Sequence, residues 1–120
     1  MTTNEELRQR TKQLALRLIR LVRSLPNRVD GQVIGRQLLR SGTSAAANYR
    51  ATCRARSKAE FVAKLSIVVE EMDETLFWLE LVSESGMVQA RRLEGLLREA
   101  TELTAIFASA RRTARSNQRN

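Results

Sequence analysis

The chain has 120 residues, of which 42% are apolar, with 21 Lys and Arg against 13 Asp and Glu, and it contains no histidine. This length supports one domain with one core and excludes two, and no run approaches the roughly 18 apolar residues of a membrane span. Because only five side chains are aromatic and one residue is proline, long helices with an aliphatic core are favoured over a β-sandwich.

The first predicted helix covers residues 3–24. Thr3 or Asn4 can cap its start, and Pro26 ends it because the residue before a proline is pushed out of the α region. Its apolar positions recur at steps of three and four, the period of an amphipathic helix. These positions are Leu7, Thr11, Leu14, Leu18, Leu21 and Leu25.

The second predicted helix covers residues 30–53. Between residues 41 and 47 no side chain is larger than threonine, which predicts a close helix crossing near Gly42. A glycine within a helix is about 1 kcal/mol less favourable than alanine, so packing must compensate. The predicted apolar face consists of Val33, Ile34, Leu38, Gly42, Ala45, Ala46, Tyr49 and Cys53.

Ser57 and Glu60 have the spacing of a capping box, which predicts the start of a third helix over residues 58–84, ended by Gly86. A fourth helix is predicted over residues 89–110, with an apolar face of Leu93, Leu96, Leu97, Ala100, Leu103 and Phe107. Short connections predict an all-α, antiparallel, up-down-up-down four-helix bundle over residues 1–110. Residues 111–120 lack apolar anchors, so we expect a basic, disordered tail.

The third predicted helix has a second apolar face. Phe61, Leu65, Val68, Met72, Leu76 and Leu79 share the side expected to face the core. Ile67, Trp78 and Leu81 lie on another side, with Phe77 nearby. Two interpretations stay open: a buried arc wider than usual, or a subunit interface, in which Trp is a favoured anchor.

Glu70 and Glu74 lie beside that second face, one helical turn apart. Paired carboxylates can perform acid–base chemistry or hold a metal, but di-iron bundles use Glu-x-x-His motifs and this chain has no histidine. Salt bridges to Arg36, Arg40 or Arg50 are therefore favoured, and we expect no metal and no cofactor.

Catalysis is not expected. The chain has neither a glycine-rich phosphate loop nor a Ser/His/Asp set. Cys53 lies near Arg50, Arg54 and Arg56, but without a histidine base we interpret it as a helix-face residue. A single cysteine excludes an internal disulfide, and the polar N-terminus has no signal-peptide pattern, so we expect a cytoplasmic, bacterial, non-enzymatic protein.

Nucleic acid is the favoured partner, because the polar face of the first predicted helix is almost wholly positive and more cations follow. Such a surface contacts phosphates with steep salt dependence and little sequence preference. The alternatives are a merely solvated arginine face and an oligomeric protein-binding adaptor. The predicted nucleic-acid-binding residues are Arg8, Lys12, Arg20, Arg23, Arg50, Arg54, Arg56, Lys58, Arg111, Arg112 and Arg115.

Three blocks, residues 40–50, 54–61 and 71–80, carry a family resemblance. Their sequences are RSGTSAAANYR, RARSKAEF and EMDETLFWLE. The chain resembles the bacterial four helix bundle protein family, which includes proteins encoded within intervening sequences of 23S ribosomal RNA genes. It is also similar to the accessory variability protein of diversity-generating retroelements. The resemblance spans residues 5–107.

The resemblance implies a cytoplasmic bundle that assembles as a basic homopentamer and, in the retroelement branch, binds a reverse transcriptase and nucleic acid. The Ser/Asn motif of the family maps to Ser41, Ser44 and Asn48, and its glutamate to Glu74; these positions look structural. The commoner family form has Ile-Ala-Glu-Gly after the asparagine, whereas residues 49–52 here are Tyr-Arg-Ala-Thr, which makes this turn more basic.

Overall fold

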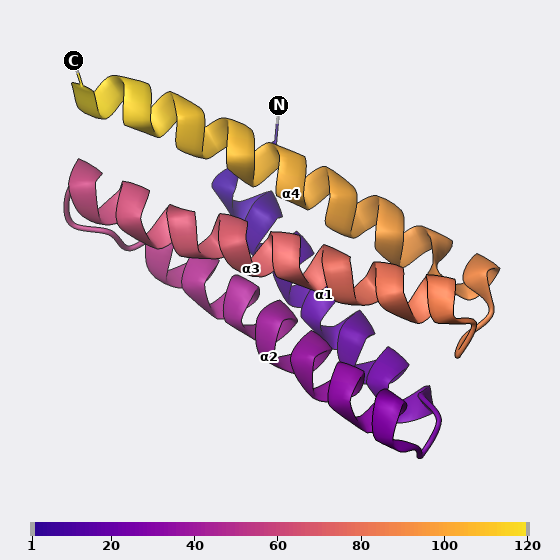
Figure 1. Ribbon diagram of the computed structural model, residues 1–120. Helices are drawn as coiled ribbons and strands as arrows, with labels where there is room; N and C mark the ends of the chain where they lie inside the picture. Colours follow the sequence, from indigo (N-terminus) through magenta and orange to yellow (C-terminus); the bar gives the residue numbers. More distant parts are fainter. Residues whose placement is uncertain (1, 120) are drawn as a thin grey trace.

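The computed structural model describes residues 2–119, which form four α-helices and no strand (Figure 1). The helices are α1 Asn4–Ser24, α2 Val29–Thr52, α3 Lys58–Ser85 and α4 Ala90–Arg119. They lie side by side in an elongated bundle of about 50 × 23 × 21 Å. None of the described helices combines the length and apolarity that crossing a bilayer requires.

The helices form a ring in which each packs against the next along the chain, and α4 packs lightly against α1. Within residues 2–119 the backbones of the diagonal pairs, α1 with α3 and α2 with α4, do not approach closely, although the rings of Tyr49 (α2) and Phe107 (α4) meet in the core with centroids 4.8 Å apart. The short connections make consecutive helices antiparallel, which confirms the predicted four-helix bundle. Because α1 and α3 are diagonal, their outer faces point to opposite sides of the molecule.

The core is the predicted aliphatic one. Its largest fully buried side chains are Phe107, Leu14, Leu18, Leu38, Leu65, Met72, Leu79, Leu93 and Leu103. One position assigned to the apolar face of the second helix was wrong: Val33 is 50% exposed. The positions that face inward on α2 are glycine, serine, alanine and threonine, together with Leu38 and Tyr49, so most of the side chains that α2 buries are small.

Gly42 marks the predicted close crossing. A Cβ atom built on Gly42 would lie within 3.0 Å of the fully buried Leu18 Cδ1 of α1. The helix pair that approaches closely here is therefore α1 and α2.

Side-chain caps define the helix starts at Thr3 and Ser57. The Thr3 side chain accepts from the Glu6 backbone N–H, and Glu6 accepts from the Thr3 N–H, which completes a capping box. At α3 only one half of the predicted box forms: Ser57 Oγ accepts from Glu60 N over 3.0 Å, while the Glu60 carboxylate lies 4.0 Å from Lys64 Nζ. Gly86 has a φ of 76° and ends α3 as predicted.

The predicted end of the fourth helix at residue 110 was wrong, because α4 continues to Arg119. Residues 111–118 contain neither glycine nor proline, so nothing local stops the helix. This end of α4 also has neighbours: Arg115 Nη2 donates to Ser66 Oγ of α3 over 3.5 Å, and Ala114 and Asn117 line a hollow beside the α2–α3 connection. The expected basic tail, up to residue 119, is thus the last part of α4.

Candidate nucleic-acid interface

A groove of about 520 Å³ lies between α1 and α2 and gathers four of the predicted cations. We call it the α1/α2 groove. Its cations are Arg8, Lys12, Arg50 and Arg54, and one acid, Glu5, lines it beside its partner Arg8. Small side chains lie between them, among them Ala15, Thr43, Ala46 and Ala47. Because the crossing helices approach closely, cations from both helices reach one surface.

A second hollow, of about 360 Å³, adjoins this groove across Arg50 and Arg54, which line both. It adds the predicted Arg56 together with Lys64 of α3. Glu60 is the only acid among its lining residues. The C-terminal end of α2 is therefore a positive ridge with a hollow on each side.

A third groove, of about 310 Å³, lies between α1 and α4, and we call it the α1/α4 groove. Three arginines line it: Arg17 and Arg20 of α1 and Arg92 of α4. No acidic residue lines this groove. Cations therefore flank α1 on both sides.

Two arginines of α1 have acidic partners. Arg10 Nη2 lies 2.6 Å from Glu99 Oε1 and 3.2 Å from Glu102 Oε1 of α4, and the hydrogen bond to Glu99 raises the pKa of Arg10 above its usual value. Through these ion pairs Arg10 links α1 to α4. Arg8 pairs with Glu5, yet its Nε is buried with no acceptor within residues 2–119.

The other predicted cations do not join the α1/α2 groove. Arg23 lines a separate hollow with Arg36, beside the α1–α2 connection. Lys58 lines the hollow beside the C-terminal end of α4 together with Arg56. The predicted α4 cations lie along that end of the helix; they are Arg111, Arg112 and Arg115.

Four groove-lining cations were missing from the predicted set: Arg17, Arg36, Lys64 and Arg92. Arg17 flanks the leucine stripe of α1, so periodicity could have added it. Lys64 and Arg92 belong to helices that only the fold brings beside the other cations, and no sequence signal marks them.

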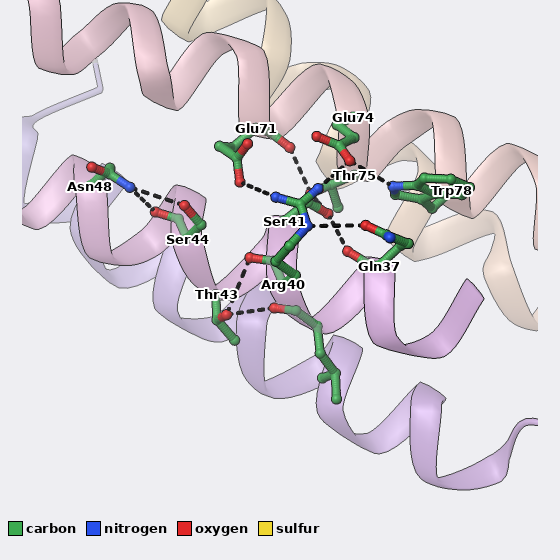
Figure 2. A network of polar contacts seen from close by, with 11 residues as sticks. Gln37, Arg40, Ser41, Thr43, Ser44, Asn48, Glu71, Glu74, Thr75 and Trp78 are labelled. Carbon is green, nitrogen blue, oxygen red and sulfur yellow. Dashed lines mark hydrogen bonds and ion pairs between the residues drawn. The ribbon is translucent and has the colours of Figure 1, made fainter. Parts of the chain in front are cut away.

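A polar network joins α2 to α3 on another side of the bundle (Figure 2). Arg40 Nη1 lies 3.2 Å from Glu71 Oε2, and Arg40 Nη2 pairs with Glu74. Trp78 Nε1 donates to Glu74 Oε1 over 3.2 Å. The hydrogen bond from Arg40 is the largest cause of a lowered Glu74 pKa. The predicted salt bridge of Glu74 is therefore confirmed, with Arg40 as its partner.

Buried hydroxyls in the same network tie α2 to α3. The Thr75 hydroxyl donates to Ser41 Oγ over 2.8 Å, and the Ser41 hydroxyl donates to the Gln37 carbonyl over 2.9 Å. Asn48 instead bonds within its own helix, to the carbonyl and the hydroxyl of Ser44. Within residues 2–119 no group of His, Cys, Asp or Glu side chains is arranged to hold a metal ion.

The second apolar face of α3 is partly buried, as a wide buried arc predicts, and partly exposed, as a subunit interface requires. Trp78 is half-buried against the core, and Leu81 is also half-buried. Ile67 and Phe77 are 43% and 50% exposed, and the predicted Glu70 is exposed beside them. The buried arc of α3 is wide enough to include part of Trp78, while Ile67 and Phe77 form the apolar surface that stays open.

Comparison with known proteins gives a family and a solved fold. Residues 3–109 match the family described as 23S rRNA-intervening sequence protein. A crystal structure of a protein of unknown function from the S23 ribosomal protein family of Bacteroides thetaiotaomicron is similar to this chain, with 31% identity and a TM-score of 0.82. The match covers 91% of this chain and 97% of that one. No curated protein matches the chain significantly.

Proposed function

The chain belongs to the 23S rRNA-intervening sequence protein family, and from that premise we propose that it is a non-enzymatic oligomeric bundle that binds nucleic acid through phosphate contacts. The observation that supports this most is the α1/α2 groove, where α1, α2 and the residues just after α2 bring four cations together. A cationic groove concentrates positive potential, which attracts a polyanion.

The contents of the groove favour phosphate as the ligand. Three of its four cations are arginines, whose guanidinium groups bind phosphate oxygens in a fork geometry. None of the chain's aromatic residues lines the groove, so bases have no stacking platform there. Backbone contact then supplies the affinity.

Salt dependence tests the proposal. With four phosphate contacts, the logarithm of the association constant should fall with the logarithm of salt concentration at a slope of about −3.6 on duplex DNA. Removing two of the contacts by Arg50→Gln and Arg54→Gln should bring the slope to about −1.8. Fluorescence anisotropy with labelled duplexes measures both slopes.

The matched control also removes two charges, by Arg91→Gln and Arg98→Gln. Both arginines are exposed on α4 and line none of the grooves described above, so the slope should stay near the wild-type value. Equal losses in the two double variants would show that total charge matters and the groove does not. No binding at low salt would leave an adaptor for an acidic protein, or for a polymerase complex, as the function.

We further propose that copies of the chain associate through the outer face of α3, five copies being the number that the family resemblance implies. Ile67 and Phe77 leave this face apolar beside acidic residues. Phe77→Glu should lower the mass measured by light scattering, and Ala105→Glu, at an exposed position of α4, is the control for added charge. An unchanged mass for Phe77→Glu would remove this face as the contact. Trp78 is a poorer test site, because it also packs against the core.

A further inference from the structure

The outer face of α1 carries three exposed side chains that could contact bases. Gln9, Gln13 and Leu16 follow one another at steps of four and three, which places them along one side of the helix. We call this line the α1 crest. Gln9 donates to Glu5 over 3.3 Å, while the Gln13 side chain makes no hydrogen bond within residues 2–119. Leu16 is 38% exposed.

Two residues of the α1 crest, Gln13 and Leu16, line neither of the cationic grooves that flank α1, while Gln9 is at the edge of the α1/α2 groove. Arg8 and Lys12 line the α1/α2 groove, while Arg17 and Arg20 line the α1/α4 groove. A helix with its side chains is about 10–12 Å across, so cations on opposite flanks of α1, such as Arg8 and Arg17, can lie about one helix width apart. The major groove of B-form DNA is about 12 Å wide, and a phosphate backbone borders it on each side. The arrangement of α1 matches that spacing.

The chemistry of the crest suits base edges in that groove. A glutamine amide both donates and accepts, which is the pattern that adenine N6 and N7 require, and an aliphatic side chain contacts the thymine methyl. A-form RNA does not offer these edges, because its major groove is deep and narrow. Single strands would need stacking partners, and no aromatic residue lines either flanking groove.

We propose that α1 enters the major groove of duplex DNA, with the α1 crest against base edges and each flanking groove on one phosphate backbone. This inference rests on the proposed binding of phosphates and adds the form of the nucleic acid and the groove that is read. It is also compatible with the topology, because the outer face of α3, the proposed contact between copies, is diagonal to α1 and does not include the α1 crest.

Dimethyl sulfate footprinting on a short mixed-sequence duplex tests the inference, because the reagent methylates guanine N7 in the major groove and adenine N3 in the minor groove. At saturating full-length protein, we expect protection of N7 and full reactivity of N3. Binding with N7 still reactive, or with N3 alone protected, would overturn the inference. A matched RNA duplex should bind more weakly, and equal binding of the two duplexes would also overturn it.

The double variant Gln13→Ala and Leu16→Ala separates base contacts from phosphate contacts. Both positions are exposed, and alanine favours the helix, so the fold should be kept. The salt slope should be unchanged. The ratio between the affinities for the best and the worst duplex sequence should be roughly fivefold or more smaller than in the wild type. Gln118→Ala, on the exposed end of α4, is the control. If the protein bound neither duplex, the proposed function itself would be refuted. If it bound in a salt-sensitive way without protecting N7, only this inference would be refuted.

Discussion

The same substitution at two mid-helix glycines should change stability in opposite directions. Gly42 lies within α2 and Gly95 within α4. Replacing either glycine by alanine gains about 1 kcal/mol of helix propensity. The outcome is then decided by what the new Cβ atom meets.

At Gly42 the Cβ atom would overlap Cδ1 of Leu18, which is 0% exposed and has no room to move. Overpacking of this kind costs about 1–3 kcal/mol, so the net change should be a loss of up to about 2 kcal/mol. At Gly95 the nearest atom is Arg17 Nη2, at 3.0 Å, the end of a flexible side chain that can swing into solvent. Gly95→Ala should therefore gain close to the full 1 kcal/mol.

Thermal unfolding followed by circular dichroism measures both changes, since 1 kcal/mol moves the midpoint by roughly 3–5 °C at this chain length. A further variant isolates the cause: in a Leu18→Ala background the obstacle is gone, so Gly42→Ala should become stabilising by about 1 kcal/mol. If Gly42→Ala raised the midpoint of the otherwise unchanged chain as much as Gly95→Ala does, the close α1–α2 crossing would be refuted.

Three other substitutions test particular contacts. Gly86→Ala should lower the free energy of unfolding by about 1–2 kcal/mol, because φ is 76° while the Cβ position is open; urea titration would show no such loss if the left-handed end of α3 were not needed. Thr75→Val leaves Ser41 Oγ, buried, without its donor, and should lose about 1–3 kcal/mol in the same assay. The Glu74 pKa is lowered by Arg40, so this pair stabilises the fold at neutral pH and the contribution disappears as pH falls through the folded-state pKa. The midpoints of wild type and Glu74→Gln should accordingly converge between pH 7 and about pH 3, and a constant difference would contradict that assignment.

The helix starts could be predicted from sequence because their causes are local. Thr3 and Ser57 cap the helices that follow them, and Gly86 ends α3 where a left-handed residue is needed. The Leu7–Leu21 stripe of α1 is buried as its period required. The end of α4 was not predictable in the same way. Residues 111–118 lack large apolar side chains, and their neighbours in α3 and in the α2–α3 connection are distant in sequence.

The candidate site also combines features that the local sequence predicts with features that only the helix packing decides. Arg8 and Lys12 are one turn apart on α1, so this pair could be assigned to an exposed helix face from its spacing, whereas Arg50 lies in the last turn of α2 and Arg54 lies in the α2–α3 connection. That the two pairs share one groove depends on the α1–α2 crossing at Gly42. In the same way, only the packing of α4 against α1 brings Arg92 beside the arginines of the first helix.

The sequence alone indicated the four helices, the caps at Thr3 and Ser57, the aliphatic core and the excess of positive charge, because each depends on residues within a few turns of one another. The tertiary structure decided which cations meet, which acids neutralise Arg10 and Arg40, and that the basic face of α1 and the apolar, acidic face of α3 lie on opposite sides. Those outcomes depend on helix crossings, which position side chains that are far apart along the chain.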